Sequence, residues 1–298
     1  MQTTLIYNPH AGGAARLPVE ALLAALRRAG YAATHRPTRD EHELDAALAG
    51  VTGLVVAAGG DGTLRAVASR LVGRDVSLWP LPLGTANNVC KALGIRGAAL
   101  ELIAAPGSPC SRPLDLGYVQ GPWGESYTLE GLGFGLFAEA LATYDPEAGK
   151  SVLRGVRAAF TAFAARRARR YSFALDGRDL SGEYLLVEVL NTPAAGPRLR
   201  LAPEADPGDG LLDVVCVPEG DRDTLLRYAW GLLSGSLADL PSVEVHRGRR
   251  LVLGWDGFPV HLDATPRRGR AGPPGEADEL ICLDVVPGAL SVWLPGRR

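Results

Sequence analysis

Three short apolar runs near the start of the chain each lead into a glycine-bearing turn, and this arrangement restricts the fold more than any other feature. The runs span residues 3–7, 53–58 and 77–83. The turns that follow them are 8–13 (NPHAGG), 59–63 (GGDGT) and 82–87 (PLGTAN). Helix-like patterns separate the runs, as in the stretch that Pro18 opens and Gly30 closes. Strands that alternate with helices indicate a parallel sheet with helices on both faces.

These turns supply the groups that bind phosphate. In an open parallel sheet, ligands bind at the carboxyl ends of the strands, where the turns are expected to lie. Glycine lets the main chain approach a phosphate, and N–H groups at the start of the following helix point toward the anion. Asp61 is different, because its carboxylate repels phosphate unless it holds Mg²⁺ or accepts a proton from a nucleophile. The first domain is therefore predicted to bind a nucleotide, although it has neither G-x-x-x-x-G-K-S/T nor G-x-G-x-x-G.

The pattern changes after about residue 113. Strand-like runs separated by turn residues follow one another, which is typical of an antiparallel β-sandwich or barrel. The runs are 184–190, 211–217, 242–246, 250–253, 260–262 and 280–286, and two helical stretches, 151–165 and 222–233, interrupt them. We therefore predict two domains, a parallel α/β domain over residues 1–113 and an antiparallel β-sandwich domain over residues 114–286.

Composition narrows the class of protein. The chain has 298 residues, with 31 Lys and Arg against 33 Asp and Glu, and this near-neutral balance argues against a dedicated nucleic-acid binder. A hydrophobic share of 47% is typical of a globular protein, and no apolar run approaches the ~20 residues of a membrane span. The four cysteines have no zinc-site spacing, so we expect buried, reduced thiols. Since the first residues also lack a signal-peptide pattern, we expect a cytoplasmic protein.

The three turns resemble the motifs N-P-x-S-G, G-G-D-G-T and P-x-G-T-x-N of the diacylglycerol kinase catalytic family, which includes bacterial lipid kinases and the sphingosine and ceramide kinases. The resemblance continues through residues 132–135 (LGFG) with Ala138 and Glu139, 201–214 (LAPEADPGDGLLDV) and 287–295. It implies an ATP- and Mg²⁺-dependent phosphotransferase with an alcohol acceptor, a kinase of diacylglycerol or a related lipid that serves phospholipid biosynthesis. It also implies that the tail, 287–298, returns to the first domain.

The resemblance further implies the roles of particular residues. A structural Mg²⁺ would be held by Asp206, Asp209 and the main-chain carbonyl of Leu211. The lipid hydroxyl would enter a cleft between the two domains. ATP would contact Asn8, Gly12, Thr38, Gly60, Asp61, Gly62, Thr63 and Thr85.

The catalytic base is the point at which this chain departs from the family, where the second domain supplies Asp-Gly-Glu. Asp256 is followed by the expected glycine, but Phe258 replaces the glutamate. Asp263 follows the strand-like residues 259–262, as the family pattern does, but Thr265 replaces the glutamate. We favour Asp263 as the base, with Asp256 as the alternative and Asp61 assisting through Mg²⁺.

Further departures keep other functions open. Arg65 and Ala66 replace the Asn-Glu that follows G-G-D-G-T-x in the family, and Ala11 replaces the serine of its first motif. The alternatives are a nucleotide- or lipid-binding homologue without turnover, and a kinase with a non-lipid acceptor and NAD-kinase-like chemistry. No motif specifies the lipid or the oligomeric state.

A basic segment offers a route to the lipid. Residues 150–170 contain seven basic side chains and no acidic one: Lys150, Arg154, Arg157, Arg166, Arg167, Arg169 and Arg170. On a helix, such a segment would bind anionic headgroups, so we expect peripheral contact with the inner face of the membrane. A core-packed helix with a solvated arginine face would give the same pattern.

Overall fold

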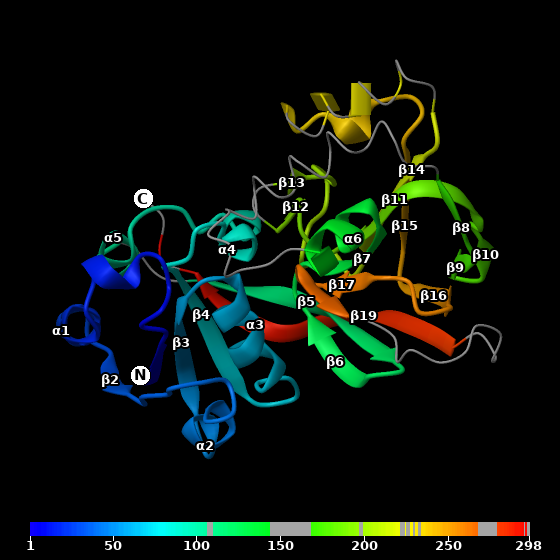
Figure 1. Ribbon diagram of the computed structural model, residues 1–298. Helices are drawn as coiled ribbons and strands as arrows, with labels where there is room; N and C mark the ends of the chain where they lie inside the picture. The colour runs from blue at the N-terminus through cyan, green and yellow to red at the C-terminus, as the bar shows by residue number, and fades with distance from the viewer. Residues whose placement is uncertain are drawn as a thin grey trace. The chain divides into compact units, whose positions relative to one another are not determined.

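The structure is a computed structural model that describes residues 1–105, 110–143, 168–196, 199–220, 224, 227–228, 230–231, 234–267, 279–294 and 296. The chain divides into two compact units (Figure 1). Unit 1 comprises Met1–Leu116, Pro207–Asp209 and Pro287–Arg298. Unit 2 comprises Gly117–Asp206 and Gly210–Val286.

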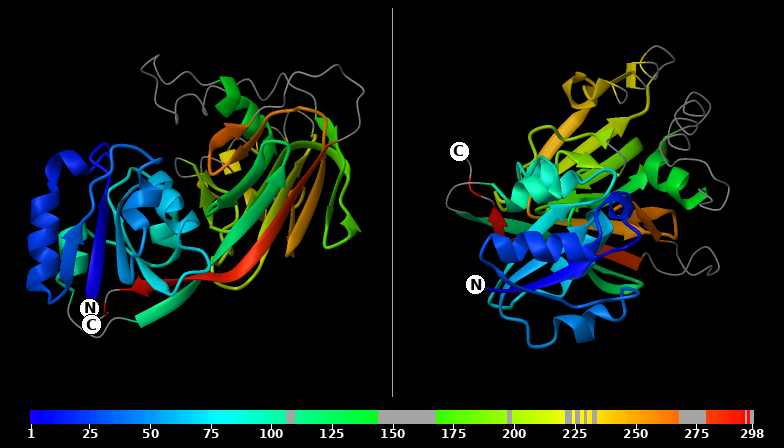
Figure 2. Two further views of the ribbon diagram at one scale, coloured as in Figure 1. Left: turned by 90° about the horizontal axis from the view of Figure 1, so that it is seen from below. Right: turned by 90° about the vertical axis from the view of Figure 1, so that its left-hand side faces the viewer.

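Unit 1 contains a parallel sheet in the strand order β4-β3-β1-β2, which confirms the predicted α/β fold. Strand β3 is buried along its length, because helices α1 and α3 pack on the sheet (Figure 2). The strands are β1 (Gln2–Tyr7), β2 (Ala32–His35), β3 (Gly53–Gly59) and β4 (Val76–Pro82). The helices are α1 (Val19–Arg28), α2 (Leu44–Leu48), α3 (Asp61–Ser69), α4 (Asn88–Ala92) and α5 (Ala99–Ile103), with a 3-10 turn at Ala14–Arg16.

The end of the chain adds a strand to this sheet. The last residues of β19 (Glu279–Leu294) pair in parallel with β4, Ser291 opposite Ser77 and Val292 opposite Leu78. The indole of Trp293 donates a hydrogen bond to the Tyr31 hydroxyl at 3.3 Å. The tail is therefore part of the unit 1 sheet and is not a loose extension.

Unit 2 is antiparallel, as predicted. One sheet has the order β15-β14-β11-β7-β17-β18, with β8 also paired to β11. Its strands are β7 (Gly131–Gly135), β8 (Arg169–Tyr171), β11 (Gly182–Leu190), β14 (Leu212–Pro218), β15 (Glu244–Gly248), β17 (Val260–Leu262) and β18 (Thr265–Arg267). The facing layer contains β9 (Phe173–Leu175), β10 (Arg178–Asp179), β16 (Arg250–Trp255) and the first part of β19, together with the hairpin of β5 (Cys110–Gly121) and β6 (Gly124–Thr128).

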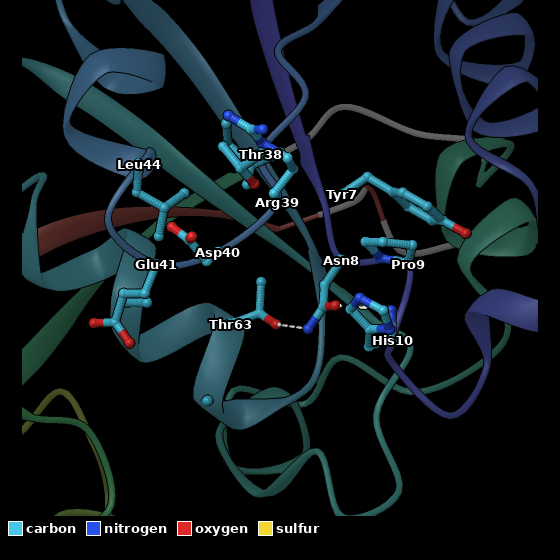
Figure 3. A pocket seen from close by; sticks show the side chains of 13 residues that line it. Tyr7, Asn8, Pro9, His10, Thr38, Arg39, Asp40, Glu41, Leu44 and Thr63 are labelled. Carbon is cyan, nitrogen blue, oxygen red and sulfur yellow. Dashed lines mark hydrogen bonds between the residues drawn. The ribbon is translucent and has the colours of Figure 1, made fainter.

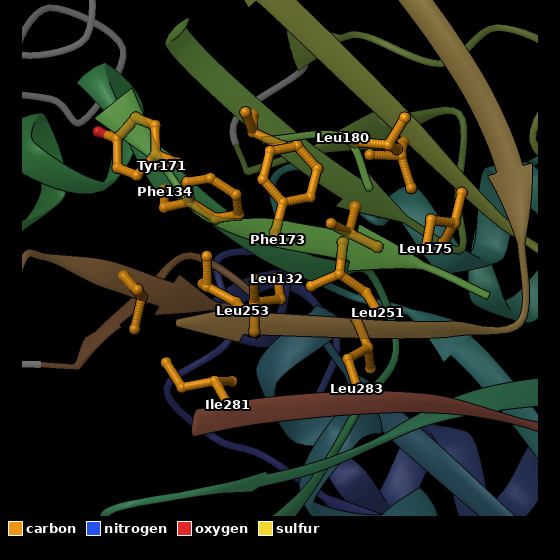
Figure 4. Close-up of a cluster of buried hydrophobic side chains, with 14 of the residues drawn as sticks. Leu132, Phe134, Tyr171, Phe173, Leu175, Leu180, Leu251, Leu253, Ile281 and Leu283 are labelled. Atoms are coloured by element: carbon orange, nitrogen blue, oxygen red, sulfur yellow. The ribbon is translucent and has the colours of Figure 1, made fainter. Parts of the chain in front are cut away.

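The central strands of the seven-stranded sheet, β7, β11 and β14, are buried on both faces. On one face, Phe134 and Val187 pack with Phe173, Leu251 and other side chains of the facing layer (Figure 4). On the other face, β11 contributes Leu186 and Leu190 to a second cluster. That cluster also contains side chains of helix α6 (Leu136–Thr143) and lies beside the short hairpin of β12 (Ala194–Ala195) and β13 (Leu199–Arg200). Because successive strand residues point to opposite faces, β11 has an almost continuous apolar sequence.

A buried polar pair interrupts the second cluster. Glu188 of β11 and His261 of β17 both lie opposite Gly133 in the intervening strand β7. Their side chains meet above that glycine, with His261 Nε2 at 3.0 Å from Glu188 Oε1. Both residues are fully buried, and the ring of Phe137 packs edge-on against the imidazole. A methyl group on Gly133 would overlap the Glu188 carboxylate, so this glycine provides the space for the pair.

We expect Gly133→Ala to lower the free energy of unfolding by about 3 kcal/mol, because the added methyl pushes apart a buried hydrogen-bonded pair. Denaturant unfolding measures this change. Gly62→Ala is the matched control, since open space surrounds Gly62 at the start of α3 and alanine favours the helix by up to about 1 kcal/mol. Equal stability of Gly133→Ala and the wild type would contradict the steric argument.

The cysteines only partly match the expectation of buried thiols. Cys90 and Cys216 are buried, but Cys110 is exposed and Cys282 is partly exposed, so the expectation is wrong for Cys110. Burial raises the pKa of the Cys90 and Cys216 thiols to about 12. Since thiolate is the reactive form, these two thiols should resist alkylation.

We therefore expect iodoacetamide at pH 8 to label Cys110 first, and Cys90 and Cys216 only after unfolding in guanidinium. Peptide mass spectrometry over time reports each site. Early labelling of Cys216 in the folded protein would show that the unit 2 core opens readily.

Candidate functional site

The three glycine turns of unit 1 meet at the carboxyl ends of their strands. The N–H of Gly13 donates to the carbonyl of Leu83 at 2.7 Å, and the N–H of Leu83 donates to the carbonyl of Gly59 at 2.8 Å. A Cβ on Gly84 would lie 2.5 Å from the Cα of Gly60. Main chain therefore packs directly against main chain, which only glycine permits at these positions.

Asn87 fixes the third turn. Its side chain accepts a hydrogen bond from the Gly84 N–H at 2.9 Å and donates one to the Gly84 carbonyl at 2.8 Å. Its φ of 51° is left-handed, a conformation that asparagine tolerates better than most residues. The turn then leads into α4, which begins at Asn88.

Asp61 lies where the second and third turns meet. It is the first residue of α3, and its Oδ1 accepts a hydrogen bond from the Val89 N–H in the first turn of α4 at 3.2 Å. Burial raises the pKa of the Asp61 carboxyl, while main-chain hydrogen bonds from Val89, Asn88 and Asn87 oppose this shift. The result is a partly buried carboxyl that holds a proton more readily than an ordinary aspartate does.

A cleft of about 270 Å³ opens beside α3 (Figure 3). Asn8 joins two of its walls, because its Nδ2 donates to Thr63 Oγ1 at 2.8 Å and its Oδ1 accepts the His10 N–H at 2.9 Å. The loop after β2 forms another wall with Thr38 and Arg39. The cleft lies in unit 1 and is lined by both polar and apolar side chains.

The predicted nucleotide residues fall into two groups that join at residues 60–63. Asn8, Thr38, Gly62 and Thr63 line the cleft. Gly12, Gly60, Asp61 and Thr85 belong to the turns, where a Cβ on Gly12 would lie 3.4 Å from Thr85 Oγ1.

The sequence prediction missed other residues of the cleft. Arg39, Asp40 and Glu41 also line it. They follow β2, a short edge strand with the sequence AATH, which contains no large apolar residue and therefore does not form an apolar run. Gly30, which has a φ of 88°, marks the turn between α1 and β2. This glycine is the sequence feature from which a strand after residue 30 could have been predicted.

In unit 2, Asp263 forms a tight turn with Ala264. Leu262 pairs with Thr265 across the β17–β18 hairpin, and the two residues between them have φ values of 48° and 59°. Two successive left-handed residues define a type I′ hairpin turn, for which Asp-Gly is a preferred sequence. Ala264 therefore occupies a position where glycine is favoured, which supports aligning Asp263 with the aspartate of the family's Asp-Gly-Glu.

The Asp263 carboxylate is extensively hydrogen-bonded. Its Oδ1 accepts from the N–H groups of Glu130 at 2.7 Å and Gly131 at 3.1 Å, and from the Thr128 hydroxyl. Its Oδ2 accepts from the Leu129 N–H at 3.0 Å. Asp263 therefore holds the segment 128–131 that precedes β7.

Asp256, the alternative base, has a different environment. Its carboxylate is more than half exposed and pairs with Arg169 Nη2 at 2.6 Å. The Arg169 guanidinium in turn lies over the ring of Phe258, 4.9 Å from its centroid. Phe258 is buried in the core, so the position that would carry the family glutamate in this alignment is apolar.

The predicted Mg²⁺ ligands are divided between the two units. Asp209, which is exposed, belongs to unit 1, whereas Asp206 and Leu211 belong to unit 2. Within the described ranges, no group of three or more His, Cys, Asp or Glu side chains is placed to hold a metal ion. The predicted Mg²⁺ site has only two such side chains, Asp206 and Asp209, together with a main-chain carbonyl, so it would not form a group of three. It therefore stays a prediction.

The predicted membrane segment is mostly outside the described residues, since these omit 144–167. Arg169 and Arg170 are described and lie in strand β8, after the helix predicted over residues 151–165, which lies outside the described residues. The helix expected at 222–233 is described only in part. No helix in the described part of the chain has the length and apolar character needed to span a membrane.

Known proteins match both units. Residues 2–119 match the diacylglycerol kinase catalytic domain, and residues 139–294 match the YegS C-terminal NAD kinase beta sandwich-like domain. A Pseudomonas aeruginosa (strain UCBPP-PA14) protein named "Probable lipid kinase YegS-like" is 34% identical, over 96% of this chain and 92% of its own. A Stenotrophomonas maltophilia (strain K279a) protein of the same name is 32% identical, over 81% of this chain and 79% of its own.

Two solved structures share the fold at low sequence identity. A diacylglycerol kinase structure from Bacillus anthracis str. Sterne covers 98% of this chain and 96% of its own, with 17% identity and a TM-score of 0.65. The structure of yeast NADH kinase in complex with NADH aligns with 100% of this chain over 84% of its own chain, with 11% identity and a TM-score of 0.51.

The parallel α/β unit with its converging glycine turns matches the diacylglycerol kinase catalytic domain, and the antiparallel β unit matches the YegS C-terminal domain, so the chain falls in the class of lipid-kinase-like proteins. The chain belongs to the family of YegS-like lipid kinases.

We expect Ala264→Gly to stabilise the protein by about 1 kcal/mol, because glycine adopts φ near 59° without the penalty that an L side chain carries there. Ala264→Val should destabilise it by more than 1 kcal/mol, since a β-branched residue is poorly tolerated at positive φ. Thermal unfolding of the two variants beside the wild type measures both effects. The same sign of change in both would rule out the left-handed turn as the cause.

Proposed function

We propose that the protein transfers the γ-phosphoryl group of ATP to a hydroxyl group of diacylglycerol or a related lipid, with Mg²⁺ as the assisting ion. The observation that carries this proposal is the convergence of three glycine turns, with the carboxyl of Asp61 where the second and third of them meet, in a chain of the lipid kinase family. Phosphoryl transfer depends mostly on positioning and on charge neutralisation, and we assign both to the main-chain N–H groups of the turns together with Mg²⁺.

The nucleotide is assigned to unit 1. Main-chain N–H groups of the turns and the start of α3 bind the phosphates. The side chains of Asn8, Thr38 and Thr63 give the adjoining cleft a lining that hydrogen-bonds to ribose or phosphate oxygens. Arg39 of the same cleft is paired with Glu43, and Asp40 and Glu41 lie beside it.

We assign the role of proton acceptor to Asp61 and not to Asp263, the residue that the sequence favoured. In the reaction, the lipid hydroxyl oxygen bonds to the γ-phosphorus, the bond from that phosphorus to the β–γ bridging oxygen breaks, and the hydroxyl proton passes to the Asp61 carboxylate. The raised pKa of Asp61 suits a group that must accept and release a proton. The oxygens of Asp263 already accept four hydrogen bonds, so we assign that residue first to holding the turn at 128–131.

Mg²⁺, when bound, neutralises charge on the phosphates. Its candidate ligands are oxygen donors, as this hard cation prefers: the carboxylates of Asp206 and Asp209 and the main-chain carbonyl of Leu211.

A second candidate function is phosphoryl transfer to a non-lipid acceptor. The exposed Thr265 stands in the position of the family glutamate, and Arg65 of α3 pairs with Glu41 at 3.4 Å where the family has asparagine. These substitutions change the surroundings of the phosphate turns and of the unit 2 hairpin. A binding protein without turnover is the remaining alternative.

ATP consumption in mixed micelles tests the proposal, with diacylglycerol, monoacylglycerol, ceramide, sphingosine and phosphatidylglycerol as separate acceptors and with Mg²⁺ present or chelated. We expect Mg²⁺-dependent turnover with at least one of them. If a folded protein that binds ATP phosphorylates none of these lipids, the lipid kinase proposal fails for this chain.

We expect Asp61→Asn to lower kcat by at least 10²-fold while ATP still binds, because the proton acceptor is lost. The melting temperature at pH 7 should not fall, since the raised pKa means that the ionised carboxylate is disfavoured in the fold and its removal costs no stability. The acidic limb of the wild-type kcat profile should lie above about pH 4, where an ordinary aspartate titrates. Asp75→Asn, at an exposed aspartate, is the matched control.

Asp263→Asn and Asp256→Asn, made separately, test the other assignments. We expect Asp263→Asn to lower the melting temperature by loosening the turn at 128–131, and Asp256→Asn to leave it nearly unchanged. A large loss of kcat in Asp263→Asn without a loss of stability would transfer the proton acceptor from Asp61 to Asp263.

A further inference from the structure

The loop that follows β2 forms one wall of the cleft in unit 1, and helix α3 forms another (Figure 3). The loop and the start of α2 contribute residues 38–41 and Leu44, and α3 contributes Gly62, Thr63 and Ala66. Thr38 and Thr63 are both predicted to contact the nucleotide. The separation of the two walls therefore decides whether both threonines can reach one ligand.

Ion pairs join the loop and the start of α2 to α3. Arg65 Nη2 lies 3.4 Å from Glu41 Oε2, and Arg70 Nη1 lies 3.4 Å from Glu41 Oε1. Arg70 Nε lies 2.9 Å from Asp45 Oδ1 in the first turn of α2. The Arg70 guanidinium is itself fixed to its helix, because Nη1 donates to the Ala66 carbonyl at 2.9 Å. Glu41 thus bridges two arginines of α3.

The Glu41 carboxylate is used for this connection. In Figure 3 its side chain extends away from Asn8 and Thr63, and both of its oxygens face guanidinium groups. The two arginine side chains are mostly covered, at 24% and 21% exposed. A single exposed ion pair contributes little, whereas several charges that form a network can hold a segment in place. The pairing also offsets a negative charge that would otherwise repel phosphates in the cleft.

We propose that Arg65 and Arg70 are positioning residues for the nucleotide, which hold the loop after β2 against α3 through Glu41 and so fix the width of the cleft. The inference rests on the proposed function in one respect, because it takes this cleft as the nucleotide site. Arg65 stands where the family has asparagine, so its pair with Glu41 is a feature of this chain's own sequence. The substitution thereby acquires a role in the site.

Hydrogen exchange of the full chain without nucleotide tests the hold on the loop. We expect peptides that cover residues 36–45 to exchange about threefold faster in Glu41→Gln and Arg65→Gln than in the wild type. About 0.5 M KCl should speed the wild type in the same way, because salt screens partly exposed pairs. Arg65→Lys keeps the charge and should exchange like the wild type. Glu20→Gln, at an exposed glutamate of α1 outside the cleft, is the matched control.

Calorimetric titration with ATP measures the effect on the site. We expect Arg65→Gln and Glu41→Gln each to raise the Kd for ATP about threefold. The double variant should bind no more weakly than Glu41→Gln alone, since that change already breaks the pair with Arg65. The sign for Glu41→Gln is decisive, because removing a negative charge near the phosphates would by itself strengthen ATP binding. Circular dichroism confirms that each variant is folded.

Two results would overturn the proposal. One is ATP binding by Glu41→Gln that is as tight as in the wild type or tighter. The other is unchanged exchange of residues 36–45 in both single variants. If the wild type fails to bind ATP while the exchange responds as expected, the proposed function fails, whereas the hold of α3 on the loop is supported.

Discussion

The direct contact between the main chains of Gly60 and Gly84 is the constraint on which the nucleotide unit depends. A Cβ on either residue would meet the other's Cα at 3.2 Å or less, so the turns after β3 and β4 can converge only as glycines. Their convergence brings the first residue of α3 to the start of α4, where Asp61 Oδ1 accepts the Val89 N–H. The raised pKa of Asp61 follows from this burial. One steric condition therefore sets the position and the acidity of the proposed proton acceptor.

Unit 2 uses its ionisable side chains mainly to build structure. Asp263 holds the turn at 128–131 through hydrogen bonds to both of its carboxylate oxygens. Glu188 and His261 meet in the core over the space that Gly133 leaves. A buried pair of this kind is costly to break but contributes little beyond what an apolar pair would. The alignment of a family motif thus identifies Asp263, while its hydrogen bonds indicate what the residue does in this chain.

Several parts of the fold could be predicted because local pattern and tertiary environment agree. Residues 53–58 and 77–83 are apolar because both faces of the parallel sheet are covered, and they match β3 and β4 within two residues. Strand β2 was missed because an edge strand carries polar residues, and β7 (GLGFG) because three glycines conceal a strand. These glycines make room for the neighbouring strand β11. A Cβ on Gly133 would overlap the Glu188 carboxylate, and a Cβ on Gly131 or Gly135 would overlap main-chain atoms of β11.

The sequence by itself determined the class of protein: two domains, three phosphate-type turns and an aspartate among them, since these features are local in the chain. The tertiary structure alone decided which residues share a site and in what state. It grouped Asn8 with Thr63 across 55 positions, partly buried Asp61, and distinguished Asp263 in a left-handed turn from the exposed, ion-paired Asp256. Burial, backbone dihedral angles and hydrogen-bond partners arise from segments distant in the chain, so no local pattern encodes them.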